Sequence, residues 1–143
     1  MSQANVELLL RLWKTWNEQG EVAVIAHDFW DPDIEWHLPP EWTSVASRIA
    51  RGREAVMRQS QEFAEHMGHF RIEVVEVVDA GDEVFASLRY HARGTKSEAK
   101  VALPVFHVTR VRDGRIQRVR VFATREDAAR AAGLAPVREG GSS

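Results

Sequence analysis

Glu35 and His37 are the two residues whose types and spacing first suggest chemistry. They lie two positions apart in the stretch FWDPDIEWHLPPEW, residues 29–42. Residues two apart on a β-strand share a face, so Glu35 can orient the imidazole or share its proton. Imidazole titrates near neutral pH and serves as a general acid or base. The alternative interpretation is a strand-edge histidine that is hydrogen-bonded to a loop, with Glu35 in water.

A cavity would need walls and a hydrogen-bond donor, and other residues supply candidates for both. Tyr90 is the only tyrosine and the best candidate donor to a ligand carbonyl. Trp13 and Trp42 are candidate walls because large aromatic rings bind flat apolar ligands. Asn17, one turn after Trp13, either faces the cavity or helps to end its helix. The remaining predicted cavity residues are apolar: Phe63, Met67, Leu88, Phe106, Val108, Val119 and Val121.

Several kinds of site are not expected. The chain has no cysteine, which excludes thiol nucleophiles and thiolate metal sites. His66 and His69 have no third ligand in register, so we expect no metal. No phosphate loop, nucleophile elbow or dinucleotide fingerprint is present. We therefore expect a protein that works without a cofactor.

Composition indicates one soluble domain. The chain has 143 residues with 44% hydrophobic and 28% charged residues, which is ordinary globular composition. A net charge of −2 gives no basic surface for nucleic acid. We see no signal peptide and no apolar run near the roughly 20 residues of a membrane span, so we expect no membrane partner and a cytoplasmic location. Residues 1–135 should form the domain and residues 136–143 a flexible tail.

The hydrophobic pattern predicts the elements that would position these residues. Helices are expected over residues 5–20, with Asn5 as the N-cap, and over residues 22–27, 53–67 and 125–133. Strands are expected over residues 34–39, on both sides of the turn at 79–82, and on both sides of the turn at 113–114. Residues 30–33 and 41–51 are expected to form a turn and a loop. This order favours an α+β fold with the helices packed on one face of the sheet.

This order of elements, with the stretches LWKTWNEQGE, FWDPDIEWHLPP, RGREAV and DGRIQRVRVFATREDAARAAGL, resembles the SnoaL-like and ketosteroid-isomerase-like family of the nuclear transport factor 2-like superfamily. The resemblance covers residues 6–133. It implies a cone-shaped, cystatin-like α+β barrel. In that fold a strongly bent antiparallel sheet wraps around three helices, and the mouth of the cone leads to an apolar pocket. Such a fold does not by itself decide the reaction.

The resemblance also assigns roles residue by residue. It places the family's isomerase base on His37, the phenolic oxyanion donor on Trp13 and the second donor, a protonated aspartic acid, on Phe106. Phenylalanine offers no hydrogen bond, so the steroid isomerase reaction itself is not expected. The Asp–Arg–Asp set of the related limonene epoxide hydrolase is absent. The acidic residue that SnoaL-like cyclases carry on the last strand, here residues 118–123, is absent too.

On the strand that follows the turn at 79–82, we expect Val84, Ala86, Leu88 and Tyr90 to face the helices and the cavity. The strand around residues 101–108 is apolar on both faces. We expect one row to point inward: Ala102, Pro104, Phe106 and Val108. We expect the other row to point outward: Val101, Leu103, Val105 and His107. An apolar outer row needs a cover, and a homodimer through the outer sheet face would supply it.

The leading hypothesis is a cofactor-independent enzyme of the isomerase, cyclase or lyase type. His37 would move a proton of a small apolar molecule that carries a carbonyl or an aromatic ring, with Glu35 or Tyr90 assisting. One alternative is a binding protein for a small hydrophobic ligand without chemistry. Another is a dimeric assembly module that works through the back of the sheet. The enzyme hypothesis requires that His37 face a closed cavity.

Overall fold

The computed structural model describes residues 2–42, 48–93 and 100–134, so the expected tail at 136–143 lies outside the described residues. Its helices are α1 (Ser2–Gln19), α2 (Val22–Phe29), α3 (Arg53–Met67) and α4 (Arg125–Ala131), with a short 3-10 turn at Pro40–Trp42. Its strands are β1 (Trp30–His37), β2 (Ile49–Arg51), β3 (Phe70–Asp79), β4 (Glu83–Arg93), β5 (Lys100–Arg112) and β6 (Arg115–Phe122). The strands form one curved sheet in the order β2-β1-β6-β5-β4-β3. The expected α+β class is confirmed.

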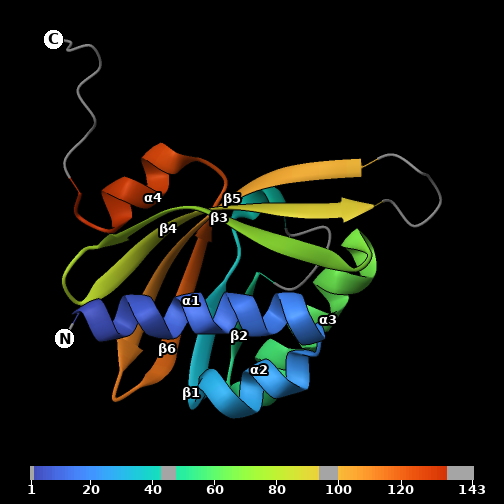
Figure 1. Cartoon of the computed structure of the whole chain (residues 1–143), viewed down its shortest axis with the longest axis horizontal. Coiled ribbons are helices and arrows are strands. Elements are labelled where there is room, and N and C mark those ends of the chain that lie inside the picture. Colours follow the sequence, from blue (N-terminus) through green and yellow to red (C-terminus); the bar gives the residue numbers. More distant parts are fainter. Residues whose placement is uncertain (1, 43–47, 94–99, 135–143) are drawn as a thin grey trace, which may run out of the picture.

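The sheet has a separate apolar core on each side. The larger core lies between the sheet and the three N-terminal helices, α1, α2 and α3. The smaller core lies under α4, where Ala128 and Ala129 pack with Phe85 and Val108. Figure 1 shows α4 set apart from the other three helices. No helix in the described part of the chain is long and apolar enough to cross a membrane.

The helix predictions hold with small changes at the ends. Helix α3 has the expected bounds. Helix α1 already begins at Ser2, so Asn5 lies inside the helix and the N-cap prediction is wrong. Thr124 caps α4 as its sequence suggests, because its Oγ1 accepts a hydrogen bond from the Asp127 backbone N–H at 3.1 Å. An Asp, Asn, Ser or Thr oxygen at this position satisfies a free N–H of the first turn.

The first strand differs from the prediction in two ways. Residues 30–33 were expected to form a turn, yet β1 begins at Trp30 and its pairing with β6 shifts register between Trp30 and Glu35. This pairing is parallel, so the sheet is mixed and not wholly antiparallel. The expected loop also contains β2, which pairs antiparallel with β1 from Glu35 to His37.

The predicted faces of β4 are right, and those of β5 are reversed. Leu88 and Ala86 on β4 lie in the larger core, and they pair with Val105 and His107 on β5. Directly paired residues share a face, so Val105 and His107 point inward. Phe106 and Val108 instead pack in the smaller core under α4. That cover is why both rows of β5 are apolar.

The argument for a homodimer loses its basis with this correction. Val105 is fully buried and His107 is 3% exposed, so they form no outer surface that needs a cover. Helix α4 of the same chain covers part of the row that does point outward. The dimer stays a prediction without this support.

Asn17 joins α1 to the edge strand β3. Its Nδ2 donates to the Ile72 carbonyl oxygen and its Oδ1 accepts from the Ile72 N–H, both at 2.8 Å. Because β3 is the last strand of the sheet, these backbone groups have no neighbouring strand on that side. The Asn17 amide makes the two hydrogen bonds that a neighbouring strand would otherwise make.

Replacing Asn17 with alanine should lower the free energy of unfolding by about 1–2 kcal/mol, since two backbone groups of Ile72 lose their partners. Urea unfolding measures this change. The control is Gln19→Ala, at an exposed position of the same helix, which should cost less than about 0.5 kcal/mol. Equal effects of the two variants would contradict the proposed role of Asn17.

Candidate functional site

A cavity of about 100 Å³ lies between the three N-terminal helices and the inner face of the sheet. All five tryptophans of the chain line it: Trp13, Trp16, Trp30, Trp36 and Trp42. The other lining residues are Leu9, Leu12, Val22, Ile25, Leu38, Gln59, Ser60, Phe63, Phe70, Ile72, Tyr90, His107, Ile116, Val119 and Val121. The surface is therefore mainly aromatic and aliphatic, as in most small-molecule sites.

Stacked rings form flat parts of the wall. The Trp42 and Phe63 rings are stacked with centroids 5.3 Å apart, and the Phe70 and Tyr90 rings with centroids 4.6 Å apart. Phe63 also meets Tyr90 edge to face, with centroids 6.0 Å apart. These contacts connect the 3-10 turn, α3, β3 and β4, so several elements hold each ring in place. Stacked and edge-to-face contacts of this kind are the preferred aromatic geometries.

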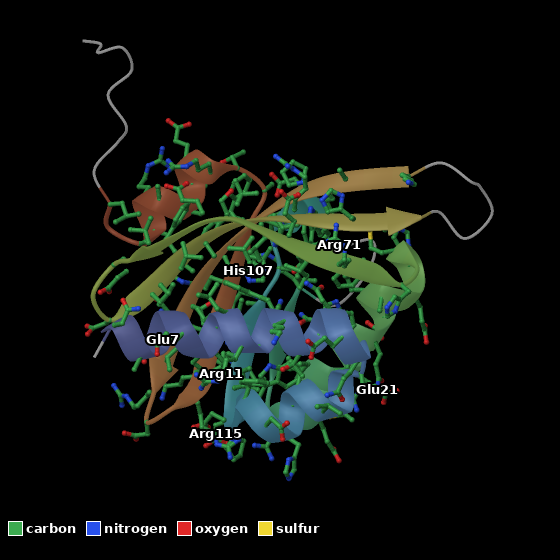
Figure 2. The ribbon with its side chains drawn as sticks, viewed as in Figure 1. Glu7, Arg11, Glu21, Arg71, His107 and Arg115 are labelled. Carbon is green, nitrogen blue, oxygen red and sulfur yellow. The ribbon has the colours of Figure 1, made fainter. Side chains whose placement is uncertain are left out.

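Tyr90 and His107 form a buried polar pair in this apolar wall. Tyr90 Oη lies 3.1 Å from His107 Nε2, and the two residues are 6% and 3% exposed. Trp36 holds the imidazole from another side, edge to face at 5.8 Å between centroids. Figure 2 shows His107 near the centre of the molecule, whereas the labelled residues Glu7, Arg11, Glu21 and Arg71 are exposed.

Burial keeps both members of the pair neutral. It raises the pKa of the Tyr90 hydroxyl above its usual range and lowers the pKa of His107 to about 3. In this buried site the charged form of either group would have neither the hydration shell that it has in water nor an opposite charge nearby. At neutral pH, His107 therefore has one N–H and one free ring nitrogen, and Tyr90 keeps its proton. The pair is a hydrogen-bonding site and not an ionic one.

The rest of the cavity lining is almost free of polar groups. Gln59 Nε2 donates to the Trp36 carbonyl oxygen at 3.4 Å, which ties α3 to β1. Ser60 also lies at the cavity. Among the described residues the lining contains no Asp, Glu, Lys or Arg. No group of three potential metal ligands occurs in the described parts of the chain.

The cavity does not include Glu35 or His37. On β1 the inward positions belong to Ile34 and Trp36. Glu35 and His37 alternate with them and therefore face the other side of the sheet. The register agrees, because Trp36 pairs with the cavity residue Val119, whereas Glu35 pairs with the outward residue Arg118. The expectation that His37 faces a closed cavity is wrong.

Glu35 and His37 do form the predicted pair, on the outer face. His37 Nε2 lies 3.0 Å from Glu35 Oε1, and Arg51 Nε lies 3.6 Å from Glu35 Oε2. The hydrogen bond from His37 is the main cause that lowers the pKa of the Glu35 carboxyl. The side chains are 28% and 37% exposed, so solvent reaches both. The alternative interpretation is not met either, because His37 contacts Glu35 and not a loop, and its strand has a neighbour on each side.

The other predicted site residues divide into two groups. The cavity lining contains Trp13, Trp42, Phe63, Tyr90, Val119 and Val121, and their role in binding stays a prediction. The lining does not contain Asn17, Met67, Leu88, Phe106 or Val108. Asn17 binds the backbone of β3. Met67 and Leu88 pack within the larger core, and Phe106 and Val108 belong to the core under α4.

His107 is the functional candidate that sequence reasoning missed. Pairing across the Asp113–Gly114 turn starts regularly with Arg112 opposite Arg115, and continued without a shift it would place Phe106 opposite Val121. Gln117 is an extra residue on β6, because Val111 pairs with Ile116 and Arg110 with Arg118. After this bulge His107 is opposite Val121. A shift of one residue moves every later side chain of β6 to the other face, so the inward residue Val121 has His107 and not Phe106 as its neighbour. No sequence signal marks this shift.

Comparisons with known proteins identify the fold. A family model described as a SnoaL-like domain matches residues 9–119. Among solved structures, TerC co-crystallised with polyporic acid has a TM-score of 0.72 at 17% identity, covering 91% of this chain and 98% of that one. A nuclear transport factor 2-like protein of unknown function from Burkholderia pseudomallei has a TM-score of 0.73 at 14% identity, covering 89% and 95%. No curated protein matches the sequence significantly.

A further solved structure is a putative SnoaL-like polyketide cyclase from Jannaschia sp. CCS1. Its TM-score is 0.68 at 19% identity, and the match covers 94% of this chain and 95% of that one. At such identities the structural likeness shows the fold and not the activity. Together with the family model, it confirms the resemblance that the sequence suggested.

The low pKa of His107 has a consequence for stability. Lowering the pH from 7 to 5 should reduce the free energy of unfolding by about 2 kcal/mol. The unfolded imidazole takes up a proton below its ordinary pKa of 6.5, whereas the folded one stays neutral down to about pH 3. The stabilisation is thus complete above pH 6.5 and is lost as the pH falls.

Urea unfolding at both pH values measures this loss, with His107→Gln as the control. The variant should show a much flatter pH dependence, since glutamine does not titrate and can still hydrogen-bond to Tyr90. The range from pH 5 to pH 7 also lies above the pKa values of the Glu35 and Glu73 carboxyls, which are lowered from 4.5. Identical slopes for the two proteins would contradict the buried, neutral state of His107.

Proposed function

The chain belongs to the SnoaL-like domain family, and from that membership we propose that its cavity binds a small apolar molecule and polarises one oxygen atom of it. Tyr90 would make the hydrogen bond to this oxygen, and His107, bonded to Tyr90, would orient its hydroxyl. The chemistry would be a proton transfer of the isomerase, cyclase or lyase type. The observation that carries the proposal is the 3.1 Å contact between Tyr90 and His107 in an otherwise apolar, aromatic wall.

The pair suits an oxygen that changes between carbonyl and hydroxyl. If His107 carries its proton on Nε2, that N–H donates to Tyr90 Oη, and the Tyr90 hydroxyl is free to donate to a ligand carbonyl. If Nε2 is free, Tyr90 donates to it, and Tyr90 Oη is free to accept from a ligand hydroxyl. A neutral imidazole permits both tautomers. The same site therefore satisfies the keto and enol forms of one substrate.

A neutral donor in an apolar site favours enolisation. Negative charge grows on the carbonyl oxygen as a solvent water takes the proton from the neighbouring carbon, and a fixed donor stabilises that charge most in the transition state. The stacking of Tyr90 on Phe70 holds the hydroxyl in place. Two neighbours support an oxygen-containing small-molecule ligand: one structure contains polyporic acid, and another is described as a putative polyketide cyclase.

Binding without chemistry is the second candidate, and one observation favours it. The described lining has no carboxylate or amine to act as a strong base, and an imidazole with a pKa of about 3 is a weak one. A pocket of this kind would hold a ligand by apolar contact and one hydrogen bond. The two candidates share a binding mode and differ in whether a proton leaves the ligand.

Deuterium exchange tests the enzyme without knowledge of its natural substrate. In D₂O the protein should accelerate exchange at the carbon next to the carbonyl of small cyclic ketones, measured by proton NMR. Tyr90→Phe keeps the ring and removes the hydroxyl, so it should reduce the rate by about 10²-fold. Its ligand affinity should fall by less than about tenfold, because one neutral hydrogen bond contributes little to binding.

His37→Ala is the matched control, because it removes an imidazole from the outer face and leaves the cavity unchanged. It should exchange as fast as the wild type. Loss of exchange in His37→Ala, with Tyr90→Phe unaffected, would overturn this proposal and restore the hypothesis first drawn from the sequence. Binding that depends on Tyr90 without any exchange would leave the ligand-binding function and exclude the catalytic one.

A further inference from the structure

We infer that the cavity selects an uncharged molecule with a single flat ring and one polar oxygen, and that it rejects ionised molecules and molecules with two fused rings. This inference rests on the proposed function, because it names the class of ligand for the same site. It follows from three properties of the cavity: its volume, the shape of its walls and the charge of its lining.

The volume limits the ligand to about one ring. The cavity measures about 100 Å³. An engineered protein cavity of roughly 150 Å³ binds benzene, so the space here suits one six-membered ring. Side chains from the three N-terminal helices and five strands line it, and a ligand that needs more room inside the cavity would have to move residues such as Trp13 and Trp16, which are almost fully buried. Moving packed core residues is costly because protein interiors are close-packed.

The shape of the walls favours a flat ring. Trp42 and Phe63 are nearly parallel, at 17° between ring planes, and Phe70 and Tyr90 are nearly parallel at 18°. Each pair presents ring faces and edges that a planar ligand can contact over its whole area. Aromatic contacts of this kind add to the apolar burial of the ligand.

The charge of the lining excludes ions of either sign. Among the described lining residues only Tyr90 and His107 titrate, and burial keeps both neutral at neutral pH. A bound carboxylate or ammonium would lose its hydration without an opposite charge nearby. Glu35, His37 and Arg51 cannot supply one, because they lie on the outer face of the sheet. A neutral ligand meets no such cost.

The position of the polar pair indicates a ligand with one oxygen. Tyr90 Oη and His107 Nε2 are bonded to each other, so the Tyr90 hydroxyl has one further hydrogen bond for a ligand oxygen. The adjoining wall is aromatic, which suits the remaining ring atoms. Phenol and cyclohexenone are simple molecules of this class.

Isothermal titration calorimetry with three pairs of probes tests each property. Benzamide and benzoate have similar shapes and differ in charge, and benzamide should bind at least about a hundredfold more tightly, given the cost of burying an unpaired charge. Phenol should bind the wild type more tightly than 2-naphthol does. Phenol should also bind about three- to tenfold more tightly than toluene, and Tyr90→Phe should remove that advantage.

Leu12→Ala supports the size test in a protein that still folds, since Leu12 is only partly buried. It enlarges the cavity and should admit 2-naphthol, while leaving the preference for benzamide over benzoate unchanged. Tighter wild-type binding of 2-naphthol than of phenol, or binding of benzoate equal to that of benzamide, would overturn the inference about ligand class.

These results also separate the failure of the inference from the failure of the proposed function. If the larger or charged probes bind better and Tyr90→Phe still weakens them, the ligand class is wrong and the site is right. If Tyr90→Phe changes the binding of no oxygen-bearing probe, the proposed function fails, and the inference fails with it.

Discussion

A single extra residue in β6, Gln117, sets the chemistry of the cavity. It shifts the pairing of β5 with β6 by one position, so that His107 lies opposite Val121. Side chains alternate along a strand, and a bulge therefore exchanges the faces of every residue beyond it. On β5 the side chains alternate regularly, with Val105, His107 and Val111 on the inner face. The bulge therefore changes the faces of β6: Val119 and Val121 enter the cavity wall, where Arg118 and Arg120 would otherwise lie.

Placing two polar groups in an apolar wall has an energetic cost that the protein offsets by pairing them. A buried hydroxyl or imidazole without a partner would lose its hydrogen bonds to water. Tyr90 and His107 satisfy each other at 3.1 Å, and Trp36, Phe63 and Phe70 hold the two rings. The cost that remains is visible in the depressed pKa of His107. A group kept neutral and desolvated in a cavity is typical of functional sites.

The two faces of the sheet differ in the side chains that they carry. The inner face carries the cavity, and the outer face carries charge. On the outer face Glu83, only 13% exposed, binds Arg118 and Arg120 at 2.9 and 3.0 Å. Arg120 also donates to the Ala131 carbonyl oxygen at 3.3 Å, which links β6 to the end of α4. The Glu35–His37 pair belongs to this face, and its neighbours are ions and water, not a ligand.

The sequence alone determined most of the elements and the family. Local signals were enough for α3, the cap of α4, the Asp113–Gly114 turn and the inner face of β4, because each depends on residues close in the chain. The sequence also identified Tyr90 and the tryptophan walls. Tertiary structure alone decided which side chains of β1 and β5 meet in the cavity. That choice depends on the irregular pairing of β1 with β6 after Trp30 and on the unshifted pairing of β5 with β4. Both strands carry side chains that suit either face, and only the pairing with neighbouring strands selects between the two.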